Sequence, residues 1–297
     1  MAKLLDERGH SVLGFADSCD VLEHVASDET LDALITSVEL TPLSGPELCW
    51  EARLLAKWRR PIYIMLMSSN IDERMTIECL DMGADDVIPK PPSKQQLFAR
   101  LRVGERNICL QRELIWLATT DPMTGLLNRR AFFERGSEMC DDAGEDRSLA
   151  AILFDLDHFK EINDLYGHET GDRAIQAIAG EAQNGHSVVG RLGGDELCIL
   201  IKRCGMSRAW DLAEDLRCRV SNLRIPTPDG TTSVTCSLGV SALDRGEDID
   251  DLIRNADLAL YRAKFEGRNC VSTPPSTTWM EENPRQTKTI ARRKKRS

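Results

Sequence analysis

Hydrophobic and polar residues follow two different periods along the first 100 residues of the chain. Residues 31–37 and 61–68 are short, continuous apolar runs, which are typical of buried strands. Residues 83–91 contain the end of a helix, a short strand and a turn. Helical patterns separate these strands, and this alternation predicts an α/β domain over residues 1–100.

Residues 92–120 carry one long helical pattern. Five apolar residues recur near helical spacing between charged residues: Leu97, Leu101, Ile108, Leu114 and Leu117. Gly104 weakens the middle of this helix by about 1 kcal/mol relative to Ala. Two interpretations of the linker, residues 101–120, stay open. It is either a dimeric coiled coil, for which the heptads are few, or an amphipathic helix packed on its own domain.

The pattern of apolar residues over 121–272 predicts a second domain that mixes strands and helices. Strands are expected over 150–157, 188–201 (a hairpin) and 233–241, and helices over 172–183, 208–223 and 249–265. The apolar stripe of the helix over 208–223 is expected to consist of Trp210, Leu212, Ala213, Leu216 and Val220.

Acidic side chains mark the ends of two of these strands. Apolar runs flank Gly193-Gly194-Asp195-Glu196, which predicts a hairpin with two carboxylates at its tip. Asp155 and Asp157 end the strand over 150–157 on one face, with Leu156 on the other. A solvated acidic turn would explain the hairpin tip alone. A strand-end acid facing a hairpin-tip acid is instead typical of a metal-dependent phosphoryl-transfer site.

Composition narrows the function classes. The chain has 297 residues, enough for two domains, and its net charge of −10 argues against specific nucleic-acid binding. No apolar run approaches the ~20 residues of a membrane span, and no signal peptide is visible. The ten cysteines are scattered and the five histidines form no ligand cluster with them, so a zinc site is not expected. A reduced, cytoplasmic protein is predicted.

The second domain resembles a GGDEF-domain diguanylate cyclase from Asp121 to about Val271. Six motifs match in order and spacing: Asp121-Pro-Met-Thr-Gly-Leu-Leu-Asn-Arg129, Asp155-Leu-Asp-His-Phe-Lys-Glu-Ile-Asn163, Gly167-His168, Gly171-Asp172, Arg191-Leu-Gly-Gly-Asp-Glu-Leu197 and Ala256-Asp-Leu-Ala-Leu-Tyr-Arg-Ala-Lys-Phe-Glu-Gly-Arg-Asn269. Leu197 stands where the family has Phe, and because both are apolar we expect little loss. The resemblance implies a palm-like α+β sheet of ferredoxin-like order. It also implies the condensation of two GTP into cyclic di-GMP and two pyrophosphates by a dimer that uses Mg²⁺ (or Mn²⁺).

The resemblance also implies roles for single residues. The carboxylates of Asp155 and Asp195 and the carbonyl of Leu156 would bind the metal, and Asp195 or Glu196 would accept the proton of the attacking 3′-hydroxyl. The expected GTP contacts are Asn163 and Asp172 with guanine, His168, Gly193, Gly194, and the cations Lys160, Lys264 and Arg268 with the phosphates.

Two further expectations follow from the same motifs. Lys264 and Arg268 are four residues apart, so they would share a helix face if the helix continues that far. The family's product-inhibition site, an Arg and an Asp, is expected to be absent, because Asn184 and Ser187 occupy its positions.

The first domain resembles a flavodoxin-like response-regulator receiver that is degenerate. The best match is the run from Gly83 through Pro89-Lys90-Pro91, and Ser68 stands at the switch-hydroxyl position. Ser37 replaces the phosphoacceptor aspartate, so phosphorylation there is not expected.

The first, central strand of a receiver would precede Met1. Without it two apolar edges lack a partner, so either the true start lies upstream or the sheet is repaired in another way. We expect this domain and the linker helix to form a homodimer, and an unidentified signalling protein is a further candidate partner.

The main hypothesis is therefore an active diguanylate cyclase. The alternatives are a catalytically silent GTP-binding or scaffold module that acts through protein contacts, and a cyclase with altered base choice, against which Asp172 argues. Residues 273–297 are polar and then basic, which predicts a disordered tail.

Overall fold

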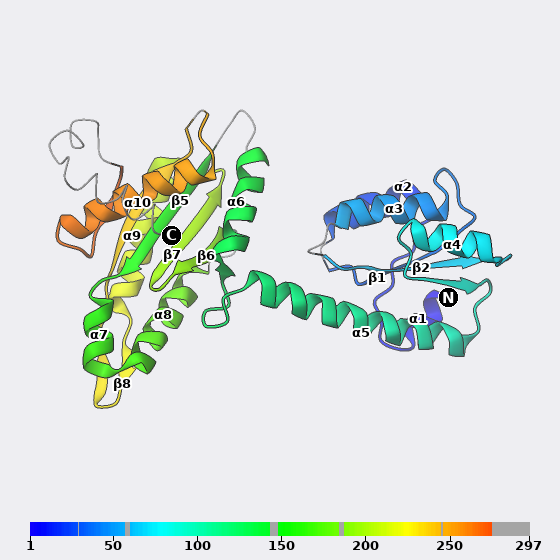
Figure 1. The fold of residues 1–297 in the computed structure, drawn as a ribbon, viewed down its shortest axis with the longest axis horizontal. Helices are drawn as coiled ribbons and strands as arrows, with labels where there is room; N and C mark the ends of the chain where they lie inside the picture. The colour runs from blue at the N-terminus through cyan, green and yellow to red at the C-terminus, as the bar shows by residue number, and fades with distance from the viewer. Residues whose placement is uncertain (29, 57–59, 143–147, 184–186, 245, 275–297) are drawn as a thin grey trace. The chain divides into compact units, whose positions relative to one another are not determined.

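The chain divides into two compact units, Met1–Trp116 and Leu117–Ser297, in a computed structural model (Figure 1). It describes residues 1–28, 30–56, 60–142, 148–183, 187–244 and 246–274. The predictions for the tail from residue 275 and for Asn184 therefore lie outside the described residues.

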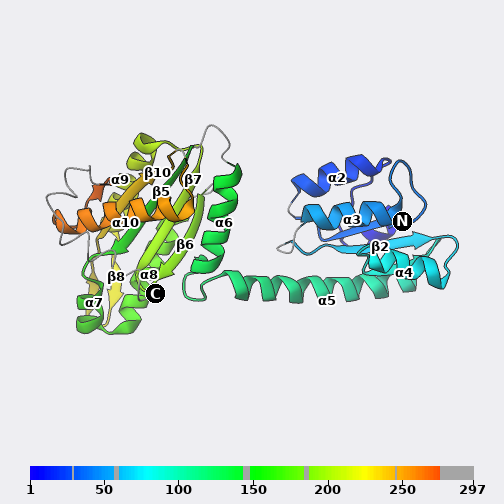
Figure 2. The same cartoon turned by 45° about the horizontal axis from the view of Figure 1, so that its top comes forward.

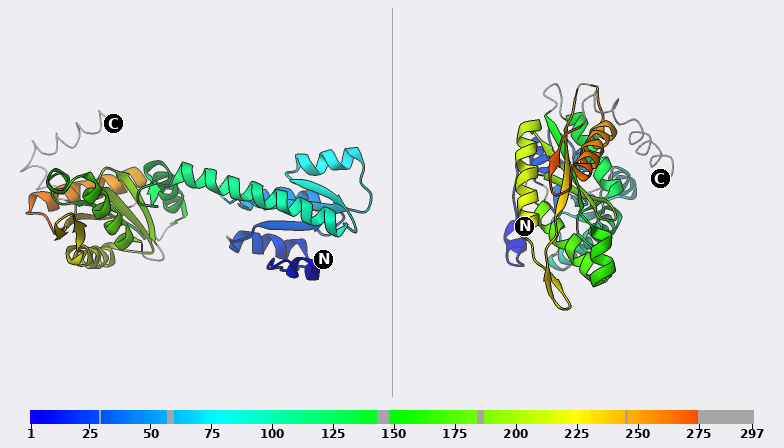
Figure 3. Two further views of the ribbon diagram at one scale, coloured as in Figure 1. Left: turned by 90° about the horizontal axis from the view of Figure 1, so that it is seen from below. Right: turned by 90° about the vertical axis from the view of Figure 1, so that its left-hand side faces the viewer.

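The first unit alternates helices with strands, as the apolar runs predicted. Its elements are α1 (Ala2–Asp6), α2 (Ser18–Ser27), β1 (Ala33–Ser37), α3 (Gly45–Ala56), β2 (Tyr63–Ser68), α4 (Glu73–Asp81), β3 (Asp86–Pro89) and α5 (Lys94–Thr119). The strands form a parallel sheet in the order β1-β2-β3. Helix α5 is one continuous helix (Figure 3). At Gly104 within it, the missing Cβ makes room for the ring of Tyr63.

Alternating side chains of β2 face two helical layers, which makes this unit an α/β/α sandwich (Figure 2). Ile64 and Leu66 pack with α2, α3 and α4, while Tyr63, Met65 and Met67 pack with α1 and α5. All of these side chains are buried, because β2 is the central strand and both its faces are covered.

The central strand expected of a receiver sheet has no counterpart among the described residues, where β1 has a strand neighbour on one side only. Leu4 and Leu5 at α1 and Val12 after it pack against the core beside β1 and β2. These side chains cover part of the apolar surface that the sequence pattern left without a partner.

The second unit holds the remaining elements. They are β4 (Leu127–Asn128), α6 (Arg129–Asp142), β5 (Leu149–Leu156), α7 (Phe159–Tyr166), α8 (His168–Ala182), β6 (Ser187–Gly193), β7 (Glu196–Lys202), α9 (Met206–Asn222), β8 (Ile225–Thr227), β9 (Gly230–Thr232), β10 (Cys236–Ala242), α10 (Ile249–Phe265) and β11 (Val271–Ser272).

The main sheet of this unit has the order β11-β10-β5-β7-β6-β4, and its core β10-β5-β7-β6 is antiparallel throughout. In chain order the core reads strand, helices, strand, strand, helix, strand, which is the ferredoxin-like arrangement that the resemblance implied. Helices α8 and α9 cover one face, and α6 and α10 cover the other (Figures 1 and 2). Helix α10 lies so close to β10 that a Cβ at Gly239 would stand 2.1 Å from the carbonyl oxygen of Ala256.

One predicted apolar stripe was partly wrong. On α9 the buried residues are Ala209, Ala213, Leu216 and Val220. Trp210 and Leu212 are 37% and 39% exposed, because they flank this stripe instead of lying on it. Among the described residues, we find no helix that combines the length and the apolar character needed to cross a membrane.

Candidate active site

The predicted hairpin is formed by β6 and β7, and its tip is open. Gly194 has a φ of 54°, a left-handed conformation that glycine adopts without steric cost. A Cβ at Gly193 or Gly194 would meet no described atom within 4 Å. A ligand can therefore approach the backbone of this turn closely.

A buried carboxylate lies beside the hairpin. Asp155, the residue before the end of β5, is paired with Glu196 of β7 and is 6% exposed. Burial raises the pKa of the Asp155 carboxyl to about 6; Lys264 opposes this shift, and the negative charge of Asp195 adds to it. Nζ of Lys264 lies 2.6 Å from Oδ2 of Asp155. Neighbouring carboxylates are stabilised by a proton or a cation, and Lys264 supplies one positive charge to Asp155.

The donor set of this cluster fits a hard divalent cation. The carboxylates of Asp155 and Asp195 and the backbone carbonyl of Leu156 are oxygen donors, which Mg²⁺ and Mn²⁺ prefer. Among the described residues, no group of three or more His, Cys, Asp or Glu side chains is arranged to hold a metal ion. An ion here would thus need further oxygen ligands from water or from a phosphate.

Asp157 has a different role from Asp155, although the strand pattern placed them side by side. Its carboxylate accepts hydrogen bonds from Oγ1 of Thr235 at 2.8 Å, from Oγ of Ser237 at 2.6 Å and from the backbone N–H of Asn269 at 3.0 Å. It is 4% exposed. Asp157 therefore ties the end of β5 to β10 and to the segment after α10.

A buried acceptor lies between α7 and α8. Oδ1 of Asn163 is buried and has no hydrogen-bond partner among the described residues. Gly171 makes room for it, since a Cβ at position 171 would stand 2.0 Å from that oxygen. His168 and Asp172 are exposed on the first turns of α8. The orphan oxygen needs an N–H donor, which a ligand bound here would supply.

The three basic residues predicted to bind phosphate lie in three different environments. Lys160 is exposed on α7, and Lys264 lies at the carboxylate cluster. Lys264 and Arg268 were expected to share a helix face only if the helix continued that far, and this condition is not met, because α10 ends at Phe265. Arg268 has a φ of 65°, and its N–H donates to the carbonyl of Ala263 at 3.1 Å, which closes the helix.

Sequence reasoning missed an ion pair that braces the hairpin. Arg191 of β6 binds the carboxylate of Asp121 and the carbonyl of Gly194. Arg191 and Asp121 both lie inside the matched motifs. They are 70 residues apart in sequence, so no local pattern indicates that they are in contact. Ser187, one of the two positions of the expected but absent product-inhibition site, is the first residue of β6.

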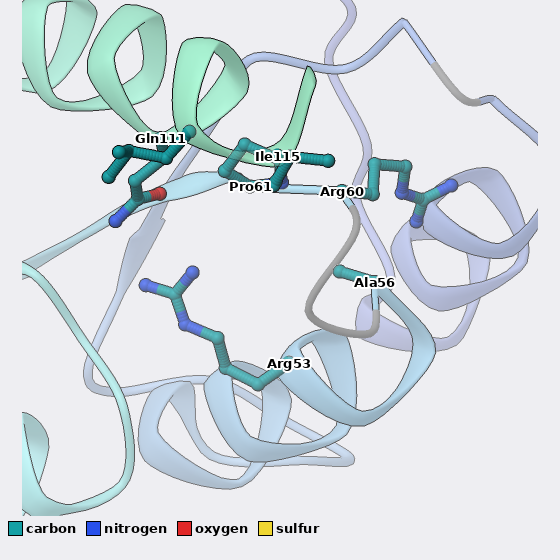
Figure 4. A pocket seen from close by; sticks show the side chains of 7 residues that line it. Arg53, Ala56, Arg60, Pro61, Gln111 and Ile115 are labelled. Atoms are coloured by element: carbon teal, nitrogen blue, oxygen red, sulfur yellow. The ribbon is translucent and has the colours of Figure 1, made fainter. Parts of the chain in front are cut away.

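A separate pocket of about 470 Å³ lies in the first unit (Figure 4). It is lined by Arg53, Arg60 and Gln111, among others. Arg53 is already bonded to Asp85 and to two carbonyls, and Arg60 donates to the carbonyls of Val25 and Asp28 at the end of α2. These arginines stabilise the fold, and no predicted site residue lines this pocket.

Comparisons with known proteins match both units. Residues 118–270 match the model of the diguanylate cyclase GGDEF domain, and residues 1–102 match the response regulator receiver domain. The chain is 41% identical over 169 residues to diguanylate cyclase DgcM of Escherichia coli, which covers 54% of this chain and 40% of that protein. It is 30% identical over 227 residues to response regulator PleD of Caulobacter vibrioides, covering 71% of this chain and 50% of PleD.

The chain thus spans half or less of the length of these curated relatives. Among solved structures, it is similar to the coiled coil and GGDEF domain of DgcB from Caulobacter crescentus in complex with c-di-GMP. That likeness has a TM-score of 0.52 and 31% identity, and covers 59% of this chain and 98% of that one.

Proposed function

The chain belongs to the GGDEF diguanylate cyclase family, and on this basis we propose that it condenses two GTP into cyclic di-GMP. The observation that carries the proposal is the buried carboxylate of Asp155, which lies 2.6 Å from Nζ of Lys264 and opposite Glu196, beside an open Gly-Gly hairpin. In each of two steps, a 3′-oxygen attacks the α-phosphorus of the other nucleotide, and the bond to the leaving pyrophosphate breaks. Such a transfer depends mostly on positioning and on neutralising charge.

Asp155, Asp195 and the carbonyl of Leu156 would hold Mg²⁺ or Mn²⁺, which would offset triphosphate charge and acidify the 3′-hydroxyl. Lys264, 2.6 Å from Asp155, balances the charge of this buried carboxylate. Asp195 or Glu196 accepts the proton of the 3′-hydroxyl; Asp195 lies in the hairpin turn and Glu196 begins β7. The open backbone of Gly193 and Gly194 leaves space for the triphosphate.

The residues of α7 and α8 would read the guanine base. The unsatisfied Oδ1 of Asn163 accepts from an N–H of the base. The carboxylate of Asp172 accepts from N1–H and the 2-amino group together, a pattern that adenine lacks. His168 stands one turn before Asp172 on α8 and contacts the same nucleotide. Lys160 and Arg268, both exposed, bind phosphate oxygens.

We further propose that α5 joins two copies of the chain. Leu97, Leu101 and Ile108 of this helix are buried within the first unit. A second stripe at heptad spacing is exposed; it consists of Val103, Leu110, Leu114 and Leu117. Exposed leucines at heptad positions fit a coiled coil, and Asn107 stands between them at a core position, where asparagine favours a parallel pair in fixed register. A dimer would bring together two GTP-loaded sites.

Incubation of the purified protein with GTP and Mg²⁺, followed by chromatography of the nucleotides, tests the activity. We expect cyclic di-GMP and pyrophosphate, and no product from ATP. Replacing Asp195 and Glu196 together by Ala should abolish synthesis and leave the protein folded in thermal unfolding, because both residues are only half-buried and neither belongs to the hydrophobic core. GTP binding without turnover in the unmodified protein would favour the silent GTP-binding module instead.

A further inference from the structure

The carboxyl ends of the strands in the first unit are joined by a polar cluster that the proposed chemistry does not use. It consists of Ser37 at the end of β1, Ser68 at the end of β2, Lys90 after β3, and Glu39. Ser37 and Ser68 are buried, with 8% and 2% exposure, while the Glu39 side chain is exposed. No sequence motif assigned a role to Glu39.

Glu39 holds two strands at once. Oγ of Ser68 donates to its Oε1 at 2.8 Å, and Oγ of Ser37 donates to its Oε2 at 3.0 Å. These hydroxyls, together with the backbone N–H groups of Glu39 and Ser69, lower the pKa of the Glu39 carboxyl. The charged carboxylate is therefore the form that the cluster binds.

Lys90 connects the same cluster to the chain that enters α5. Its Nζ donates to Oγ of Ser37 at 3.1 Å, and its backbone N–H donates to the carbonyl of Ser68 at 2.8 Å. Helix α5 begins four residues later, at Lys94. The anion, the two hydroxyls and the lysine thus fix the start of α5 against the ends of β1 and β2.

We propose that Glu39 is a permanent anion that holds the ends of β1 and β2 in one arrangement. In a receiver, a phosphoryl group on residue 37 would be needed to supply this negative charge. The hydroxyl at the switch position, Ser68, is already bound by an anion, and Ser37 offers no carboxylate to phosphorylate. An aspartate at position 37 would place a second negative charge beside Glu39, so Ser37 and Glu39 suit one another. The first unit is then locked in one state rather than switched.

Amide hydrogen exchange of the full-length protein tests this lock. Two amides report on it: Val38, which donates to the carbonyl of Met67, and Lys90, which donates to the carbonyl of Ser68. In Glu39→Gln we expect both to exchange about tenfold faster, since a bond to a charged group is lost. The amide of Leu66, inside β2, should be unchanged. Glu47→Gln is the matched control, because within the described residues the Glu47 carboxylate binds the nearby Ser44 and no strand end.

A double-mutant cycle separates the lock from a general loss of stability. Ser68→Ala should give the same acceleration as Glu39→Gln, and the double variant should add little to either. Unchanged exchange at Val38 and Lys90 in Glu39→Gln, or additive effects in the double variant, would overturn the proposal. These readouts need neither GTP nor a dimer, so a failure of the proposed function would be seen separately.

Discussion

Arg191 and Asp121 form an ion pair in which Nη1 of the arginine lies 3.1 Å from each carboxylate oxygen of the aspartate. Nε and Nη2 of the same arginine donate to the carbonyl of Gly194 at 2.9 and 2.7 Å. Burial opposes ionisation of Asp121, but hydrogen bonds from Thr124 and Arg191 hold the pKa of its carboxyl below the usual value. One planar side chain thus joins the turn that follows α5 to the hairpin that carries Asp195.

Arg191→Lys should slow cyclic di-GMP formation by about tenfold to a hundredfold, because the single nitrogen of lysine lacks the planar fork whose three nitrogens reach Asp121 and Gly194. We expect the loss in kcat rather than in the KM for GTP, since Arg191 positions the hairpin and does not bind the base. Steady-state kinetics, together with a thermal unfolding curve of the same variant, will separate a loss of kcat from misfolding. Equal kinetics in the variant and the unmodified protein would remove the positioning role.

Gly171→Ala should weaken GTP binding. The added Cβ would stand 2.0 Å from Oδ1 of Asn163, so the amide must leave the place from which it would meet the base. Gly180→Ala is the matched control on the same helix, α8, where a Cβ meets no described atom within 4 Å. The control should raise stability by about 0.5–1 kcal/mol and leave binding intact. Calorimetric titration with a non-hydrolysable GTP analogue will measure the affinity of each variant. Equal affinities of Gly171→Ala and Gly180→Ala would contradict the assignment of Asn163.

The sequence was most informative where a pattern is local. The hairpin of β6 and β7, strand β5 and helix α10 follow from apolar periodicity and from a Gly-Gly turn, all within short stretches of chain. The ferredoxin-like order is not local, and it came from the family resemblance. Pairings such as Asp121 with Arg191, or Asp157 with Asn269, join residues far apart in sequence, so no spacing rule predicts them.

One prediction failed, for the buried face of helix α9, and the condition under which Arg268 would lie on helix α10 is not met. Trp210 and Leu212 are apolar, but the stripe of α9 that the sheet buries is set by the smaller Ala209 and Ala213. Arg268 left the helix because Gly267 before it has a φ of 119°, which ends the helical run. Side-chain type alone does not fix the face or the end of a helix to within one residue.

Leu110→Glu together with Leu114→Glu should convert a dimer to monomers and slow synthesis at low protein concentration. The two leucines are 59% and 65% exposed, so the exchange should cost the monomer little stability. Sedimentation velocity over a range of concentrations will give the oligomeric state. Asn107→Leu is a useful companion, because it should strengthen association while relaxing the register. A dimer that survives both glutamates would place the interface elsewhere.

The last prediction concerns feedback by the product. Asn184 and Ser187 carry no charge where many relatives of this family have an Arg and an Asp, so cyclic di-GMP loses two charged partners there. Hydrogen bonds to charged groups contribute roughly 1.5–3 kcal/mol each, and losing two weakens binding by several orders of magnitude. Initial rates at saturating GTP should therefore be almost insensitive to added low-micromolar cyclic di-GMP. A variant with Asn184→Arg and Ser187→Asp tests whether inhibition can be restored. Strong non-competitive inhibition of the unmodified protein would mean that another surface binds the product.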